Sequence, residues 1–324
     1  MKGAWGMSFS STAKEELCQN RIHRHCCRQA ALSSWLQMSG SLQLGSGGKK
    51  KVSLTTESHA VARWGVSLAK SLYPIEAEIF VHERKQLGKH HSFVILLGGD
   101  AIEEMLFSTG QVKHTQDGIA FDGGVPEFVY KKECCKRAFL RGAFIGGGSV
   151  SNPRKGYHLE FVVRSEHMAN DLRTLLDDYG LNAKAILRKG NYVVYLKESE
   201  KITELLTLIG AHTALFDLEN VRIYKDIRNN LNRQVNCETA NIQKTVTAVG
   251  RQIESIRYLI DHDAMRRISD ELRETAEARI NNPDATLVEL CEMLSDPISK
   301  SGINHRLRKL DNIAQRLRME KGDA

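Results

Sequence analysis

Residues 26–42 read CCRQAALSSWLQMSGSL, and residues 134–150 read CCKRAFLRGAFIGGGSV. At a constant offset of 108 residues the two stretches share six identities in 17 positions, where chance would give about one. The same offset pairs His59 with His167. This internal repeat predicts that one structural unit occurs twice in the chain, with the two copies related by a pseudo-twofold axis.

The elements expected after each stretch also follow one order: strand, helix, hairpin, closing helix. In the first copy they are residues 51–55, 58–71, 76–81 with 92–97, and 100–107. In the second copy they are residues 157–164, 166–179, 183–187 with 192–196, and 198–209. The second hairpin turns at Arg188-Lys189-Gly190-Asn191, where glycine can adopt a positive φ. We expect an α+β fold, with two antiparallel sheets that carry their helices on one face.

The remainder of the chain is expected to be helical. A polar, glycine-containing joint over 108–124 separates the two copies, and strand signals stop near Leu218. Apolar residues then recur at helical spacing from Ile242 to Ile260, which indicates a long amphipathic helix. The predicted domains are a double repeat, a linker helix and a C-terminal helical domain: 7–217 (units 7–110 and 125–217), 218–262, and 263–320.

The C-terminal domain shows the pattern of a helix-turn-helix. Thr286 and Glu289 form a capping box, and Leu287, Leu290, Cys291 and Leu294 make one apolar stripe behind it. Asp296-Pro297 breaks this helix, and Ser299 or Ser301 can cap the next one. There an apolar stripe recurs at steps of four and three, formed by Ile303, Leu307, Leu310, Ala314 and Leu317.

The opposite face of that second helix is basic and rich in amides. Residues 300–318 hold six basic residues against one acid, Asp311, whereas residues 284–296 hold four acids and no base. Arginine can pair bidentately with guanine and asparagine with adenine, while flanking basic side chains contact phosphates. We predict base readout by Ser301, Asn304, His305 and Arg308, and phosphate contact and orientation by Lys300, Arg306 and Lys309. The alternative is a solvated charged face.

The composition limits the classes of partner and the cellular location that this protein can have. The chain has 324 residues, a net charge of +7 and a sequence pI of about 9.0, which permits a polyanionic partner. The strongest apolar run, residues 93–97, is too short to cross a membrane, and the first twenty residues lack a signal-peptide core, so we expect a cytoplasmic, nucleoid-associated protein. Seven cysteines with no Cys-x-x-Cys predict no disulfide framework. Translation begins at Met1 or at Met7.

Two other candidate sites are weaker. Residues 142–149 resemble a phosphate-cradling loop but lack its Lys-Ser/Thr, so we favour small residues that allow close helix approach and end in a glycine cap. His23, His25, Cys26 and Cys27 offer zinc-binding side chains at a spacing that suits no familiar site, so core or surface roles are favoured. No cofactor or metal is predicted.

Across residues 7–318 the sequence resembles the WhiA family of sporulation and cell-division regulators. The resemblance rests on Ser8-Phe9-Ser10 with Lys14-Glu15-Glu16-Leu17, on residues 137–149, on Asn152-Pro153 with Tyr157-His158-Leu159-Glu160, on Asn232-Arg233, Asn236 and Ala240-Asn241, and on residues 298–310. It implies a double repeat similar to the LAGLIDADG homing endonucleases, followed by a helix-turn-helix domain that binds promoter DNA. For an actinobacterial source it also implies an iron–sulfur WhiB-like partner.

The resemblance to nucleases raises the hypothesis of an enzyme. Those nucleases hold divalent metal ions with one carboxylate at the C-terminal end of each motif helix. Alignment of residues 140–148 with LAGLIDADG puts Gly147 at the carboxylate position, and the internal offset puts Ser39 at the equivalent position of the first copy. Neither residue is a hard anionic ligand, so no catalytic residue is predicted. Glu133 and Glu160 leave open a rearranged site.

The sequence thus favours a sequence-specific DNA-binding transcription regulator with no enzymatic activity. Two alternatives are a metal-dependent DNA endonuclease and a general nucleic-acid- or protein-binding module. The repeat pair could hold DNA through basic strand residues such as Lys50, Lys51, Lys184 and Arg188, or could dock a protein or a small ligand. Secondary DNA contacts are predicted from a second polar group placed before the long helix, made of Arg233, Asn236, Asn241 and Lys244.

Overall fold

A computed structural model describes residues 8–44, 50–84, 90–116 and 118–322. Met1 and Met7, the two candidate starts, lie outside the described residues. The chain divides after Lys225 into two compact units. Among the described residues, no helix combines the length and the apolar character that a membrane crossing requires.

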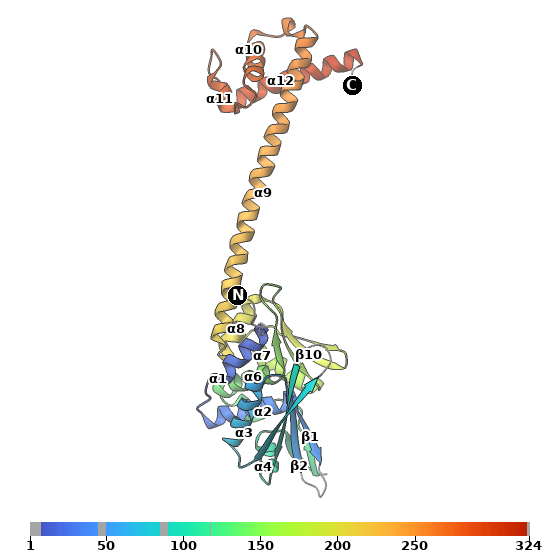
Figure 1. Ribbon diagram of the computed structural model, residues 1–324. Coiled ribbons are helices and arrows are strands. Elements are labelled where there is room, and N and C mark those ends of the chain that lie inside the picture. Colours follow the sequence, from blue (N-terminus) through green and yellow to red (C-terminus); the bar gives the residue numbers. More distant parts are fainter. Residues whose placement is uncertain (1–7, 45–49, 85–89, 117, 323–324) are drawn as a thin grey trace. The chain divides into compact units, whose positions relative to one another are not determined.

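The first unit contains two copies of one element order (Figure 1). After an N-terminal helix α1 (Phe9–Gln19), the first copy comprises α2 (His25–Ser39), β1 (Gly40–Leu44), β2 (Lys50–Thr56), α3 (His59–Lys70), β3 (Glu76–Arg84), β4 (His90–Gly98) and α4 (Ile102–Ser108). The second comprises α6 (Glu133–Gly147), β7 (Gly148–Val150), β8 (Leu159–Val163), α7 (Glu166–Asp177), β9 (Lys184–Arg188), β10 (Asn191–Leu196) and α8 (Ser199–Ile209). A hairpin of β5 (Val112–Thr115) and β6 (Gly118–Phe121) and a short helix α5 (Glu127–Tyr130) connect them.

Each copy forms a four-stranded antiparallel sheet with the same strand order. The orders are β1-β2-β4-β3 and β7-β8-β10-β9, so the second strand of each copy pairs with the far strand of the hairpin. The hairpin β9–β10 turns through Lys189 and Gly190, which both have positive φ (52° and 78°), as the two central residues of a type I′ turn require. The predicted repeat and α+β class are therefore confirmed.

The two copies meet along α2 and α6, which run side by side in the same direction. Cysteines lie together at the starts of the two helices, and Gly147 faces Met38 near their ends. Both helices are buried over most of their length, and they share one apolar core with both sheets. A Cβ on Gly142 would lie 2.2 Å from the Ala31 carbonyl oxygen, so glycine is required for the two backbones to approach this closely.

Three details of the double repeat differ from the sequence-based expectation. The predicted glycine cap is wrong, because Gly148 follows α6 with φ −81° and leads directly into β7 rather than adopting the left-handed conformation. Its lack of a Cβ matters because a Cβ there would lie 2.5 Å from the Phe144 ring. The short strands β1 and β7 give too little alternation to be located individually, and the predicted polar joint contains the hairpin β5–β6.

The second unit is helical, as predicted. It contains the end of α9 (His212–Asp261), a short 3₁₀ helix η2 (Ala264–Arg267), α10 (Asp270–Asn281), α11 (Leu287–Glu292) and α12 (Lys300–Lys321). Ile256 and Leu259 of α9 join a core formed by the apolar faces of α10, α11 and α12. Further up α9, Ile242 and Val246 are exposed, so only the last part of the predicted amphipathic stripe is buried. Pro283 follows the end of α10, where the sequence predicted a stop.

The contact at Gly142 generates a prediction about stability. Gly142→Ala places a methyl group against the Ala31 backbone, so we expect the free energy of unfolding to fall by about 1–3 kcal/mol. Gly156→Ala is the matched control in the same unit, because no atom lies within 4 Å of a Cβ at that position. Urea unfolding of the full chain measures both variants. Equal stability of the two would contradict the close approach of α2 and α6.

Candidate nucleic-acid interface

Hydrogen bonds at the helix starts fix the positions of α11 and α12. The Thr286 backbone N–H donates to Glu289 Oε2 (2.7 Å) and the Glu289 N–H donates to Thr286 Oγ1 (3.3 Å), which completes the predicted capping box. The bond from the Thr286 backbone holds the pKa of Glu289 below its ordinary value. Ser299, and not Ser301, caps α12 by accepting from the Gly302 N–H at 3.2 Å. Ser301 is left exposed in the first turn.

Helix α12 has a buried edge and an exposed edge. The predicted apolar stripe forms the buried edge: Ile303, Leu307, Leu310 and Ala314 are at most 1 % exposed, and Leu317 is partly buried beside them. On the outer edge Lys300, Ser301, His305, Arg308 and Lys309 are exposed and Asn304 is half-buried. The residues predicted to read bases therefore lie on one accessible surface, which we call the outer edge of α12.

The only acid in this stretch is turned away from the outer edge. Asp311 Oδ1 accepts a 2.6 Å hydrogen bond from the Ser255 hydroxyl on α9, and its side chain is 18 % exposed. Arg251 lies 4.0 Å from the same carboxylate. Because Asp311 faces the core of the unit, the outer edge carries positive charge and amide groups without an acid between them.

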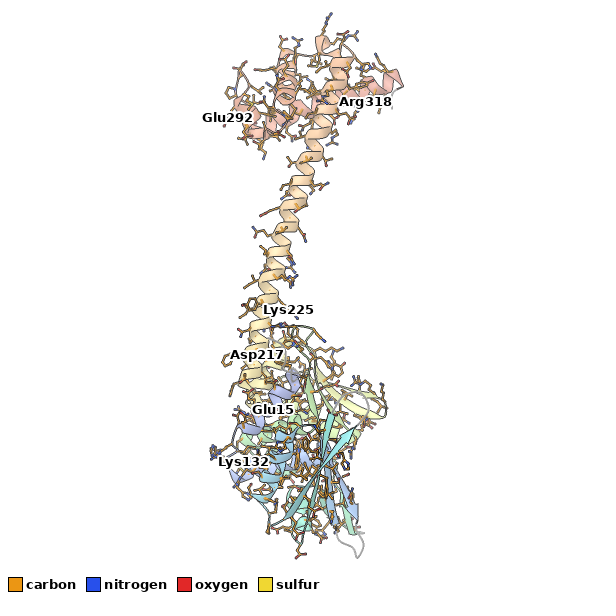
Figure 2. The ribbon with its side chains drawn as sticks, viewed as in Figure 1. Glu15, Lys132, Asp217, Lys225, Glu292 and Arg318 are labelled. Atoms are coloured by element: carbon orange, nitrogen blue, oxygen red, sulfur yellow. The ribbon has the colours of Figure 1, made fainter. Side chains whose placement is uncertain are left out.

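Two of the six basic residues bind other helices of the unit. Arg306 forms an ion pair with Glu271 of α10 (3.3 Å) and is 18 % exposed, so in this structure it joins α12 to α10. Arg318, labelled in Figure 2, donates to Glu254 at 3.0 Å and lies 4.8 Å from the Tyr258 ring centroid. Both hold α12 in place, and the sequence alone gave no sign of their partners.

The turn between α11 and α12 is also attached to α10. Glu274 accepts hydrogen bonds from the backbone N–H and the hydroxyl of Ser295, both at 2.6 Å. The Ser295 hydroxyl and then its backbone N–H lower the pKa of Glu274. The turn is therefore fixed to the scaffold, and α12 has a defined position within its unit.

Sequence reasoning missed a buried arginine that supports this arrangement. Arg279 is 1 % exposed near the end of α10, and it donates to the backbone carbonyls of Pro283 (3.4 Å) and Ala285 (2.7 Å). Burial lowers the pKa of its guanidinium. The bonds hold the segment that leads into the capping box at Thr286. A basic residue one turn before Asn-Asn-Pro is the weak signal that could have found it.

The predicted secondary contacts lie on α9. Arg233, Asn236, Asn241 and Lys244 are all exposed. At about 100° per residue they span about 140° of the helix surface, so they share one side of α9. Apart from a contact of Asn241 with Cys237 (3.8 Å), these four side chains make no hydrogen bond or ion pair within the part of the chain that the structure describes.

The two positions that the sequence alignment assigns to the nuclease carboxylates, 39 and 147, hold no acid, and position 147 offers little space for one. Ser39 ends α2 and donates to the Trp35 carbonyl (2.8 Å). A Cβ on Gly147 would lie 2.6 Å from Met38 Cε and 3.2 Å from the Val162 carbonyl oxygen. Even a short side chain at position 147 thus requires its neighbours to move.

Glu133 and Glu160, the two candidate carboxylates for a rearranged metal site, do not form a paired acid site with each other. Glu133 begins α6, about 21 Å along the helix from Gly147. Glu160 lies opposite Ser149 across the sheet and contacts His158 (3.0 Å) and Arg188 (3.2 Å). Burial alone would raise the pKa of Glu160, but His158 and Arg188 together lower it below its ordinary value. Arg188 is therefore paired with Glu160. Lys50 is likewise paired with an acid, Glu103.

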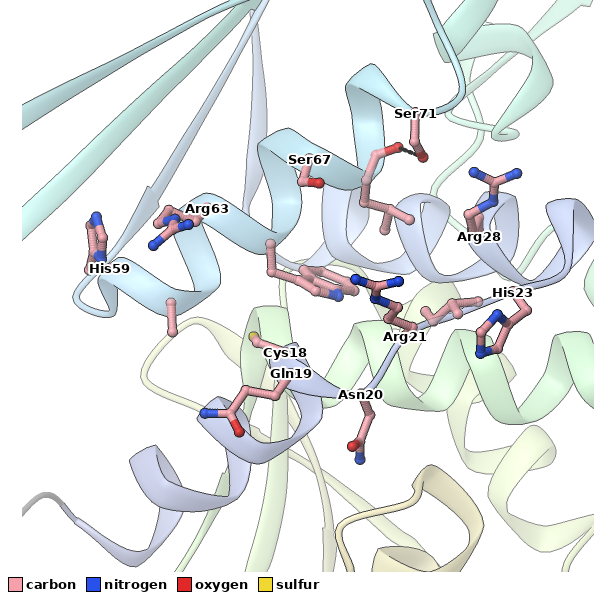
Figure 3. Close-up of a pocket in the computed structure, with 14 residues that line it drawn as sticks. Cys18, Gln19, Asn20, Arg21, His23, Arg28, His59, Arg63, Ser67 and Ser71 are labelled. Carbon is pink, nitrogen blue, oxygen red and sulfur yellow. Dashed lines mark hydrogen bonds between the residues drawn. The ribbon is translucent and has the colours of Figure 1, made fainter.

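A cleft of about 860 Å³ in the first unit gathers basic side chains from three elements. Figure 3 shows Arg21 after α1, Arg28 on α2 and Arg63 on α3, with His23 and His59 at its margins. Among the residues that the structure describes, no aspartate or glutamate lines it. The cleft therefore lacks the paired acids of a metal-dependent nuclease.

The cysteines are placed differently from the zinc-binding set that the sequence analysis weighed. Cys26 and Cys27 do not gather with His23 and His25 in a metal-binding group. They lie instead beside Cys134 and Cys135 of the other copy. Elsewhere in the described ranges, no group of three or more His, Cys, Asp or Glu side chains lies close enough to hold a metal ion.

Comparison with known proteins places each part of the chain. Residues 25–111 match the WhiA N-terminal LAGLIDADG-like domain, residues 136–228 the WhiA LAGLIDADG-like domain, and residues 231–314 the WhiA C-terminal HTH domain.

Two curated relatives are named probable cell division protein WhiA. The one from Alkaliphilus metalliredigens is 47 % identical and the one from Clostridium acetobutylicum is 45 % identical; the alignments cover 96 % and 97 % of this chain and 99 % of each relative. The crystal structure of full-length DUF199/WhiA from Thermatoga maritima is 25 % identical, with a TM-score of 0.60 over 96 % of this chain and 99 % of that one.

The buried arginine generates a second prediction. Arg279→Ala removes the donors to the Pro283 and Ala285 carbonyls and leaves a cavity, so the helical unit should lose about 2–4 kcal/mol of stability. Arg266→Ala removes the same charge from an exposed position and should change stability by less than about 0.5 kcal/mol. Urea unfolding followed by circular dichroism measures both. If the two variants unfolded alike, the supporting role of Arg279 would be wrong.

Proposed function

The chain belongs to the WhiA family, and on that premise we propose that it is a sequence-specific DNA-binding transcription regulator that acts in cell division or sporulation. The observation that carries the proposal is the outer edge of α12, which is exposed, basic and free of acids, on a helix that follows a capped helix and a turn. A helix of this kind fits the major groove of duplex DNA. The relatives from Alkaliphilus and Clostridium are named for cell division.

Some side chains of the outer edge contact DNA bases, and others contact phosphates. Arg308 can donate two hydrogen bonds to a guanine, and Asn304 can pair with an adenine. Ser301 lies in the first turn of α12 and His305 in the second, and the first turns of a recognition helix are where its side chains usually meet base edges. Lys300 and Lys309 are exposed and contact phosphates. Arg306 keeps its ion pair with Glu271 and orients the helix.

The polar side of α9 extends the proposed interface. Arg233, Asn236, Asn241 and Lys244 are exposed side chains that donate well to phosphate oxygens. We assign them to the DNA backbone, where they add affinity without reading sequence. Promoter DNA is the proposed partner and the nucleoid the proposed location. A WhiB-like partner stays a prediction for an actinobacterial source.

The proposal includes loss of nuclease activity from the double repeat. Metal-dependent cleavage needs an acid at the end of each motif helix, and here Ser39 and Gly147 occupy those ends. The tight surroundings of Gly147 support the same conclusion. Under this proposal the repeat pair remains as a scaffold, and the DNA-reading surface belongs to the helical unit.

Two substitutions on the outer edge separate base contacts from phosphate contacts. Arg308→Ala should weaken binding to the specific site by about 1–3 kcal/mol and relax the preference at one base position. Lys309→Ala should weaken binding to all sequences alike and lower the salt dependence of the binding constant by about one counterion. Titration of promoter fragments and of random duplexes over a range of salt concentrations measures both effects.

Arg266→Ala provides the charge-matched control, since it removes one positive charge from an exposed position outside α12. The promoter affinity of this variant should equal that of the unaltered chain, apart from the small salt-dependent change that loss of one distant charge produces. If Arg308→Ala and Lys309→Ala bound promoter DNA as tightly as this control, α12 would not be the recognition helix.

The loss of catalysis is tested by cleavage. With magnesium or manganese, the chain should leave plasmid DNA and promoter fragments intact, because paired carboxylates are missing at the motif ends. Gly147→Asp should not create cleavage, since one acid cannot hold the metal ions and Met38 crowds the position. Metal-dependent nicking by the unaltered chain would instead support the endonuclease alternative.

A further inference from the structure

Four cysteines meet where the two copies of the repeat join. Cys26 and Cys27 lie in the first turn of α2, and Cys134 and Cys135 lie in the first turn of α6. Their four sulfur atoms all lie within 4.8 Å of one another. The pairs are separated by the repeat offset of 108 residues, so the pseudo-twofold relation of the copies brings equivalent side chains together.

We propose that these four thiols bind a single zinc ion that joins the two repeats. Zinc takes four thiolate ligands in a tetrahedron with Zn–S distances of about 2.3 Å, which places neighbouring sulfurs about 3.8 Å apart. Sulfurs within 4.8 Å need only small side-chain rotations to reach that geometry. An iron–sulfur cluster of the 2Fe–2S or 4Fe–4S type requires wider spacing, because its cysteines are divided among two or four irons with sulfide ions between them.

The ends of both helices favour negative charge at this position. The N-caps of α2 and α6 are Arg24 and Lys132, and neither makes a side-chain capping bond. The first-turn amides of both helices therefore donate no capping bond to these N-cap side chains, and two positive helix ends converge on the sulfurs. Arg24 Nη1 lies 3.7 Å from Cys134 Sγ. A zinc tetrathiolate carries two negative charges, and these groups offset them.

The pKa values of Cys134, Cys27 and Cys135 are shifted in different directions. Contacts with Cys27 and with Arg24 lower the pKa of Cys134. Burial raises the pKa of Cys27, and it raises that of Cys135 to about 12. Cys27 also donates its proton to the Cys134 carbonyl, at 3.5 Å. Zinc binding must therefore displace protons from buried thiols, so the affinity should fall as the pH is lowered.

An ion can reach the cluster from solvent. Cys27 and Cys134 line a cavity of about 310 Å³ on the surface of the first unit. Cys26 and Cys134 are themselves partly exposed. The site thus meets the requirements of four ligands of one type, suitable spacing, supporting charges and an entry path.

The experiment uses the full chain, purified under reducing conditions and stripped of metal with a chelator. Zinc titration followed by native mass spectrometry should give one zinc per chain, with release of protons. Cobalt in place of zinc should give the thiolate-to-metal absorption and the strong visible bands of tetrahedral coordination. Zinc should also raise the temperature of unfolding of the first unit.

Variants locate the metal. Cys26→Ser and Cys134→Ser alter the two partly exposed ligands and should each abolish the tetrahedral cobalt spectrum and lower zinc affinity at least tenfold. Cys237→Ser alters an exposed cysteine on α9 outside the cluster and should bind like the unaltered chain. The spectrum of the unaltered chain tests the site even if a variant fails to fold.

Three results would overturn the proposal. The reduced chain could bind no zinc at micromolar concentrations, which would leave the cysteines as core residues. Zinc bound equally well by the Cys26→Ser variant would place the ion elsewhere. A native chain whose four thiols are joined as disulfides would make the cluster a redox site instead. None of these results bears on promoter binding by α12.

Discussion

The close approach of α2 and α6 is the constraint on which the double repeat depends. Gly142 brings the backbone of α6 against the Ala31 carbonyl, and Gly147 faces the Met38 side chain. Because each helix leads directly into the first strand of its sheet, the helix contact also fixes where both sheets begin. The same contact brings the helix starts together, so the fold and the four-cysteine cluster have one origin. Gly147 also stands at the position aligned with a nuclease carboxylate, and Met38 occupies the space that such a side chain would need.

The helical unit holds the basic helix α12 in place while its outer edge stays exposed to solvent. Apolar side chains bury the inner edge of α12, and Asp311 is turned toward Ser255. Arg306 and Arg318 contact acids of the neighbouring helices, so part of the positive charge is used for orientation. The basic residues of the outer edge, Lys300, Arg308 and Lys309, stay exposed. A rigid helix with a free basic edge is the arrangement that specific DNA contacts require.

Most of the fold could be predicted because its signals are local or repeated. The capping box at Thr286, the stop at Pro283 and the turn at Gly190 each reflect short-range chemistry, and all three occur where expected. The partners of Arg306 and Arg279 could not be predicted, because they depend on how α10 packs against other segments. The cysteine cluster was missed for a related reason. The repeat offset did carry the signal, since equivalent residues near a pseudo-twofold axis lie close to each other.

The central claim is that the outer edge of α12 lies in the major groove of the bound duplex. A photo-crosslinking residue placed at position 305, which is exposed on that edge, tests it most directly in the full chain bound to a promoter fragment. The account predicts crosslinks to bases within the protected site, and none from the same group placed at position 266. A shifted, protected duplex that forms no crosslink from position 305 would contradict it.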